Sequence, residues 1–183
     1  MKRNLTIVIS GPPGSGSSKT SLTLAKKLGL QCFSAGDLFK SYSKQRKNRA
    51  LDVWNSDFGK SGEFHQELDE YQKEKAKKGN IVICGKLSIF LLKDLADFKV
   101  WIESPLEIRA KRVAKREDIP IIRAIDQIKK REKIERREWK KIYGFDYFDS
   151  KNLADLVIDS SDKSVEENVE EILRSMKNKG LVS

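Results

Sequence analysis

The sequence contains few of the residues from which metal clusters and disulfide frameworks are built. Its 183 residues include one histidine and two cysteines. Cys32 and Cys84 lie in separate apolar runs and do not have the close spacing of metal ligands. We therefore expect both thiols to be small core residues in a reducing compartment. His65 has no catalytic partner in the pattern, and we expect it on the protein surface.

Long apolar runs are also missing. The longest, such as residues 5–9 and 89–92, are far too short to cross a membrane, and residues 1–4 lead directly into the first predicted strand without a cleavable signal. Hydrophobic residues make up 38%, which is too apolar for a disordered chain. No repeat, linker or low-complexity tract is visible. We expect one cytoplasmic, monomeric domain over residues 1–183 with no membrane partner.

Positive charge exceeds negative charge, and the excess is concentrated in one region. The net charge is +10, and residues 107–141 hold fourteen Lys or Arg against seven Asp or Glu. Such an excess suits nucleic acid, an acidic membrane or a small polyanion such as a nucleotide. Aromatic side chains that could stack on bases are not interleaved with these cations, where only Trp139 appears. Nucleic acid is therefore not the expected partner.

Short β-branched runs alternate with helical patterns along the chain. The runs at residues 5–10, 31–34, 81–84, 100–102 and 156–158 predict strands. Helices are predicted at residues 18–28, where Leu22, Ala25 and Leu28 form the apolar face, at 63–78, through the basic region after Pro105, and at 164–176. Ser164 and Glu167 form a capping box for the last helix. The pattern predicts an α/β fold, with a five-stranded parallel sheet covered by helices on both faces.

A glycine-rich loop follows the first strand and opens the first helix. Its residues are Gly11, Pro12, Pro13, Gly14, Ser15, Gly16, Ser17 and Ser18. Glycines in this position let backbone N–H groups and the helix N-terminus face phosphate oxygens. The alternative is an ordinary strand-to-helix turn. Position and spacing favour phosphate binding, and Ser18 keeps the hydroxyl that would be a ligand of Mg²⁺.

The phosphate-binding pattern G-x-x-x-x-G-K-[ST] is broken at one position, because Ser17 stands where a lysine is expected. Lys19 replaces that lysine only if the loop is two residues longer. In the simple register Lys19 lies about 200° around the helix from the lysine position and points away from the phosphates. Lys19 is then a solvated surface residue, although it remains among the candidates for binding the nucleotide.

The ordered set of motifs resembles the archaeal-type cytidylate kinases, which are nucleoside monophosphate kinases with the P-loop NTPase fold. The resemblance covers nearly the whole chain, through residues 9–16, 34–39, 67–72, 79–87, 109–112, 131–132, 143–146 and 155–159. Members of that family often carry hydroxyl residues at the position of the loop lysine. The resemblance implies transfer of the γ-phosphoryl group of ATP to CMP or dCMP. It also implies a monophosphate-binding flap, about residues 37–78, and a basic lid, about residues 109–140.

Phosphoryl transfer needs positioning and charge neutralisation, which a basic lid can supply. Arg109, Arg112 and Arg116 share one helix face at spacings of three and four residues, and Arg131 lies on the following helix. We expect Arg112, Arg116 and Arg131 to act on the triphosphate, while most of the other lid cations form a solvated face.

The candidates for binding the acceptor monophosphate or its base are Ser34, Asp37, Lys40, Asp69, Gln72 and Lys86. The resembled family usually has arginines at the positions of Lys40 and Lys86, and lysine supplies charge without a bidentate fork. Asp69 and Gln72 equally suit a solvated helix face. Asp37 suits either a water of Mg²⁺ or an N-cap.

Two other functions remain open from the sequence. One is a different small-molecule kinase on the same scaffold, which phosphorylates AMP, shikimate or dephospho-coenzyme A. The other is a non-catalytic relative that binds nucleotides or RNA. The second is favoured by the missing loop lysine, by the charge of +10 and by Glu138, which stands where the resembled family tends to have arginine.

Overall fold

The protein is built around a parallel sheet. The computed structural model describes residues 4–38 and 62–182. The five strands are β1 (Thr6–Ser10), β2 (Gln31–Ser34), β3 (Ile81–Cys84), β4 (Phe98–Glu103) and β5 (Leu156–Asp159). All pairs are parallel, in the order β2-β3-β1-β4-β5. The predicted α/β fold class is confirmed, and β1 lies at the centre, where the strand order changes direction.

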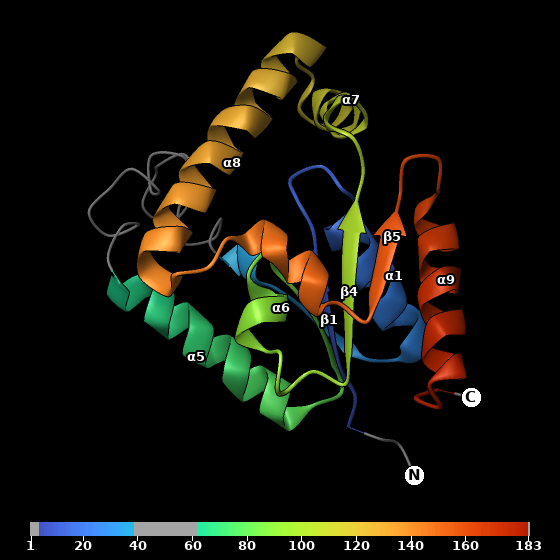
Figure 1. The fold of residues 1–183 in the computed structure, drawn as a ribbon. Coiled ribbons are helices and arrows are strands. Elements are labelled where there is room, and N and C mark those ends of the chain that lie inside the picture. The colour runs from blue at the N-terminus through green and yellow to red at the C-terminus, as the bar shows by residue number, and fades with distance from the viewer. Residues whose placement is uncertain (1–3, 39–61, 183) are drawn as a thin grey trace.

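One face of the sheet is covered by α1 (Ser17–Leu28) and α9 (Val165–Asn178) (Figure 1). Side chains of β1 alternate between the faces, and Ile7 and Ile9 pack with Leu24 of α1 and Ile172 of α9. The predicted capping box at Ser164 is present. The predicted apolar face of the first helix is partly wrong, because Leu22 is 48% exposed and Leu24 is buried instead.

The opposite face is covered by three helical elements and by the end of a fourth. They are α5 (Gly62–Lys78), α6 (Ser88–Leu91), the 3₁₀ helix η1 (Tyr147–Leu153) and the C-terminal end of α8 (Ile121–Tyr143). Val8 and Trp101 of the sheet pack there against Tyr147 and Trp139. This layer brings the end of α8 against the sheet.

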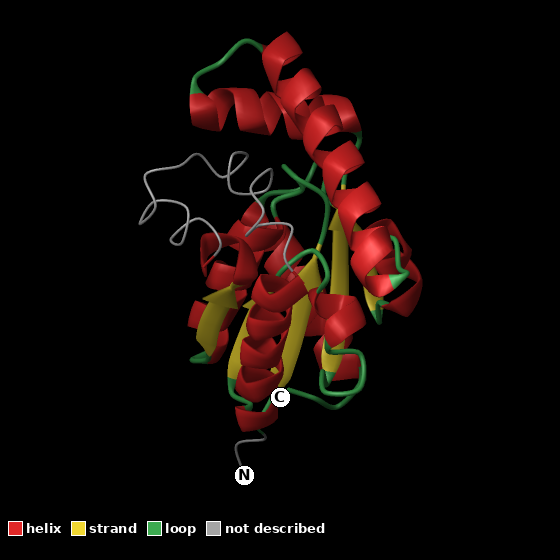
Figure 2. Ribbon diagram, turned by 90° about the vertical axis from the view of Figure 1, so that its left-hand side faces the viewer, coloured by secondary structure: helices red, strands yellow, loops and turns green. Residues whose placement is uncertain are grey.

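Two basic helices stand beyond the carboxyl ends of the strands, above the arrowheads in Figures 1 and 2. The first is α7 (Leu106–Glu117), and the second is α8. They form an apolar cluster of their own, with Ala110 and Val113 on α7 and Ala124 and Ile128 on α8. The prolines Pro105 and Pro120 lie directly before the two helices. The region predicted as a lid therefore folds as a helical hairpin over the edge of the sheet.

Two sequence-based expectations for single residues are wrong. Cys32 is exposed on β2, which lies at an edge of the sheet, so it is not a core residue. His65 is buried and lies edge-on to the Tyr143 ring at 6.3 Å, because α5 packs beneath the end of α8. Lys40 and most of the predicted flap fall outside the described residues. Among the described helices, none is long and apolar enough to span a bilayer.

Candidate active site

The glycine-rich loop connects β1 to α1 at the carboxyl end of the central strand. Gly14 and Gly16 have φ angles of 83° and 95°, which favour glycine. A Cβ atom on Gly14 would lie 2.8 Å from the Arg109 carbonyl oxygen, whereas a Cβ atom on Gly16 would meet nothing within 4 Å. The space beside Gly16 is therefore open, and it lies where the unpaired N–H groups of a helix N-terminus can receive an anion.

The first helix begins at Ser17, directly after Gly16. The Thr20 N–H group donates to the Gly16 carbonyl oxygen at 3.0 Å, and this hydrogen bond fixes the first turn. Ser18 is exposed, and its hydroxyl lies 3.8 Å from the Cys84 thiol of β3. Lys19 is exposed two positions after Ser17. This helix start agrees with the register in which Ser17 occupies the position of the loop lysine.

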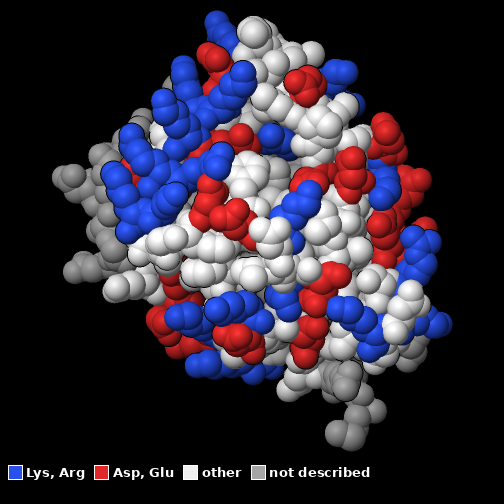
Figure 3. Space-filling view, in the orientation of Figure 1, with Lys and Arg blue, Asp and Glu red and all other residues white. Residues whose placement is uncertain are grey.

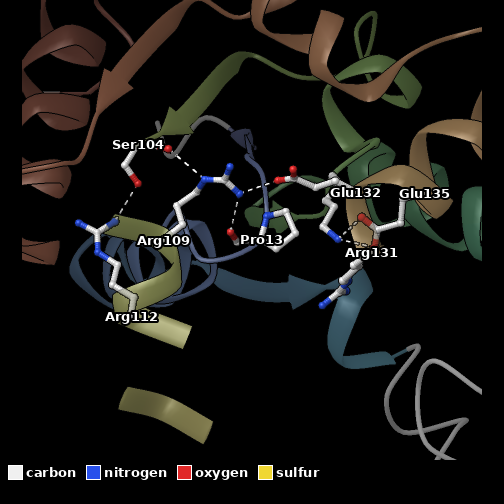
Figure 4. A network of polar contacts seen from close by, with 8 residues as sticks. Pro13, Ser104, Arg109, Arg112, Arg131, Glu132 and Glu135 are labelled. Carbon is white, nitrogen blue, oxygen red and sulfur yellow. Dashed lines mark hydrogen bonds and ion pairs between the residues drawn. The ribbon is translucent and has the colours of Figure 1, made fainter. Parts of the chain in front are cut away.

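Arg109 ties the loop to the helical hairpin (Figure 4). Its guanidinium donates to the Ser104 and Pro13 carbonyl oxygens, each at 3.0 Å, and forms an ion pair with Glu132 of α8 at 2.5 Å. The residue is only 6% exposed. Arg109 thus supports the loop from behind and is not presented to solvent.

The three arginines predicted on one face of α7 have different surroundings. Arg112 donates to the Ser15 carbonyl oxygen at 3.3 Å and to the Ser160 hydroxyl at 3.1 Å, so it bridges the loop and the end of β5. Arg116 has a side chain that is 61% exposed and pairs with its neighbour Glu117 at 2.6 Å. Arg112, like Arg109, therefore contacts the loop, whereas Arg116 extends into solvent.

A second charged group lies where α8 meets the end of β3. The Lys86 ammonium contacts both carboxylate oxygens of Glu135 at 2.5 and 2.6 Å, and the Arg131 Nε–H group donates to the same carboxylate at 2.8 Å. Burial lowers the pKa of Lys86 to about 8, although Glu135 opposes that shift. Burial alone would raise the pKa of Glu135, but Lys86 and Arg131 outweigh it and the pKa is lowered. The group is therefore ionised at pH 7.

The acceptor-side candidates on α5 are buried and do not form a solvated face. Asp69 is 8% exposed and accepts a hydrogen bond from the Tyr143 hydroxyl at 2.6 Å, and burial raises the pKa of Asp69 to about 6. Gln72 is 2% exposed and accepts a hydrogen bond from the Ser88 hydroxyl at 2.6 Å. Both contacts join α5 to other elements around the end of β3.

Two further candidates lie at the end of β2 and in the turn that follows it. The Ser34 hydroxyl accepts a hydrogen bond from the Asp37 N–H group at 3.2 Å, in a helical turn over residues 35–38. Asp37 is exposed. Because β2 and β3 are adjacent and parallel, with Ser34 beside Cys84, this turn lies next to the strand end that carries Lys86.

The donor groups near the loop fit a magnesium ion that arrives with a nucleotide. Within the described ranges, no group of three or more His, Cys, Asp or Glu side chains could hold a metal ion. Mg²⁺ in nucleotide sites takes most of its ligands from phosphates and water. A single hydroxyl such as that of Ser18, exposed beside the loop, is sufficient as the protein ligand.

The sequence did not single out Glu135 and Ser160 as parts of the site. Arg109 was expected on a basic face that could close over the triphosphate, not as the support of the loop. Glu135 lies four residues after Arg131, a spacing that indicates a helical ion pair. Its contact with Lys86 spans 49 residues and has no local signal.

The arrangement suits binding and transfer of a phosphoryl group. The glycine-rich loop at the carboxyl end of β1 contacts Arg112 of the helical hairpin. Another cation, Lys86, follows the neighbouring strand β3. Ligands of open parallel sheets bind at this edge, where the strand order changes direction.

Comparison with known proteins gives agreement over most of the chain. The model of the cytidylate kinase-like family matches residues 6–162. A cytidylate kinase of Archaeoglobus fulgidus is 37% identical over 175 residues, covering 94% of each chain. A cytidylate kinase of Pyrococcus horikoshii is 38% identical over 169 residues, covering 90% of this chain and 84% of the relative.

Solved structures with low sequence identity share the fold. An uncharacterized protein from Eubacterium ventriosum has a TM-score of 0.71 at 19% identity, covering 94% of this chain and 98% of that chain. A shikimate kinase from Acinetobacter baumannii has a TM-score of 0.67 at 13% identity, covering 99% and 97%.

Proposed function

The chain belongs to the cytidylate kinase-like family, and on that premise we propose that it transfers the γ-phosphoryl group of ATP to CMP or dCMP. The observation that carries the proposal is the loop, with Gly16 open to an anion at the N-terminus of α1. The choice of CMP or dCMP as acceptor is supported by the relatives, each of which is named cytidylate kinase. Shikimate as acceptor is supported by fold likeness alone.

On the donor side, the loop from Gly11 to Ser18 holds the phosphates of MgATP. Backbone N–H groups and the positive field at the N-terminus of α1 receive the phosphate oxygens, and the Ser18 hydroxyl would hold the magnesium ion that accompanies them. Arg112 sets the loop against β5 and carries positive charge to its edge. Arg116 reaches the phosphates from the exposed face of α7 when the hairpin closes.

On the acceptor side, Lys86 and Lys40 hold the monophosphate of CMP. Ser34 and Asp37 lie on the adjacent turn after β2. Asp69 and Gln72 present polar groups from α5, near the same strand end, to the cytosine base.

The chemistry follows from the distribution of charge. The transferred group passes through a transition state whose charge is spread over three equatorial oxygens. A magnesium ion bound with ATP would supply part of the neutralising charge, whereas Ser17 supplies none. Arg131 on α8 therefore provides the cation that a loop lysine would provide. This role is supported by the Glu135 carboxylate, which Arg131 shares with the proposed acceptor cation Lys86.

An acceptor panel tests the function. ADP release is measured with MgATP and each of CMP, dCMP, UMP, AMP and shikimate, at equal concentrations. We expect kcat/KM for CMP or dCMP to exceed that for AMP and shikimate by at least a hundredfold. Equal ADP release with every acceptor would show that the protein hydrolyses ATP. No ADP release with any acceptor would show that it only binds ATP.

A further inference from the structure

One carboxylate joins the two sides of the site. Glu135 is 1% exposed, and its two oxygens are held by Lys86, which follows β3, and by Arg131, one turn earlier on α8. Figure 4 shows Glu135 and Arg131 beside the contacts of Arg109 with Pro13 and Glu132. The carboxylate therefore lies between a proposed acceptor-side cation and a proposed donor-side cation.

The surroundings of this carboxylate are buried and aromatic. The Lys86 ammonium lies 5.8 Å from the centre of the Trp139 ring, and Trp139 meets Tyr147 edge-on at 5.1 Å. The Tyr147 hydroxyl is buried, with no hydrogen-bond partner among the described residues. Charges in such a place interact strongly, and an unpaired one is costly. Glu135 thus fixes where both cations can be.

We propose that Glu135 is a positioning residue, which holds the Lys86 ammonium and the Arg131 guanidinium in the arrangement needed for phosphoryl transfer. This inference rests on the proposed function. The carboxylate also fastens α8 to the end of β3, so the lid helix and the acceptor side are set by one group. Without it, two like charges with no common partner repel each other and lose their shared orientation.

The remaining charges nearby do not replace Glu135. Glu132, on the same face of α8, is already paired with Arg109 at 2.5 Å. Glu138, one turn further along α8, pairs with Arg137 at 2.6 Å and with Lys141 at 3.5 Å. Glu135 is the carboxylate that meets both Lys86 and Arg131. Its removal should therefore affect turnover beyond its effect on stability.

The test uses Glu135→Gln, which keeps the shape and removes the charge. We expect kcat with saturating MgATP and CMP to fall at least tenfold in the folded variant. In a Lys86→Ala background the same substitution should reduce kcat by a factor at least threefold smaller, because one of the two cations that Glu135 positions is already absent. Asp126→Asn is the matched control: this carboxylate on α8 is 69% exposed and lies 3.8 Å from Lys130. It should leave kcat unchanged.

Failure of the proposed function and failure of the inference about Glu135 give different results. If wild-type protein shows no transfer to CMP, the proposed function fails. If wild type is active and Glu135→Gln keeps more than half of its kcat while melting at a lower temperature, the residue is only structural and the inference fails. Equal losses with and without Lys86 also overturn it. Should Glu135→Gln not fold, Glu135→Asp decides: the charge remains but is withdrawn by one methylene, and kcat should fall at least threefold. A wild-type kcat would refute positioning.

Discussion

Because the loop lysine is missing, we expect a lid arginine to supply the positive charge that turnover requires. The kcat values of Arg131→Ala and Lys19→Ala, compared with each other, test this expectation. Lys19 is exposed, two positions beyond the start of α1, and helix geometry in this register predicts that it points away from the phosphates. Arg131 uses Nε for Glu135, and its guanidinium has four further N–H donors available for phosphate oxygens. The two cations should therefore differ strongly in their effect on turnover.

The expected loss of turnover depends on whether the cation acts in the ground state or in the transition state. A donor that meets the developing charge of the transition state lowers turnover by about a hundredfold or more when it is removed, which corresponds to roughly 2.7 kcal/mol. Arg131→Ala should show this loss in kcat, with a smaller change in the KM for MgATP. Lys19→Ala should cost less than about tenfold, under roughly 1.4 kcal/mol. Arg116→Ala should lie between them, because its side chain is 61% exposed.

A coupled ADP-release assay with CMP as acceptor measures both constants for each variant. Circular dichroism and thermal unfolding establish that each variant is folded. The reverse order, with Lys19→Ala more damaging than Arg131→Ala, would refute the reasoning. It would mean that Lys19 is the phosphate lysine and that the loop is functionally two residues longer.

Other expected outcomes concern the loop, the acceptor cation and a buried acid. Gly16→Val should abolish MgATP binding in calorimetry while the protein stays folded, because the side chain enters open space at a φ of 95°; unchanged affinity would place the site elsewhere. Lys86→Ala should raise the KM for CMP at least tenfold and Lys86→Arg should preserve it; an unchanged KM in Lys86→Ala would remove this residue from the site. Because the pKa of Lys86 is lowered to about 8, its charge is lost above that pH, and the KM for CMP in wild type should rise between pH 7 and 9; a flat profile would contradict this. Burial raises the pKa of Asp69 to about 6, so the ionised carboxylate lowers the stability of the folded protein above pH 6. Asp69→Asn should therefore raise the free energy of unfolding at pH 7.5 by about 1–3 kcal/mol while lowering activity. Urea titration at pH 4 and 7.5 checks that the gain in stability appears only at the higher pH.

The elements with local signals were predictable from the sequence. The β-branched runs predicted the five strands, and two of the three loop glycines, Gly14 and Gly16, lie where backbone of positive φ is required. Ser164 and Glu167 form their capping box as spacing demands. These features depend on residues within about four positions of one another, so the sequence contains the whole signal.

The contacts that organise the site span long sequence distances and were not predictable. Arg109 reaches Pro13 across 96 residues, and Lys86 reaches Glu135 across 49. Arg109, Arg112 and Arg116 lie on α7 at the predicted spacings of three and four residues, but their burial depends on where α7 crosses the loop. His65 is buried for a related reason, since α5 packs against the end of α8.

The most direct test of the central claim follows the phosphoryl group itself. ATP labelled at its γ-phosphorus is incubated with magnesium, CMP and either wild-type protein or Gly16→Val. We expect the label to appear in CDP with the wild type and to remain in ATP with the variant. Label that appears only as inorganic phosphate, or in CDP equally with both proteins, would contradict a kinase that works through this loop.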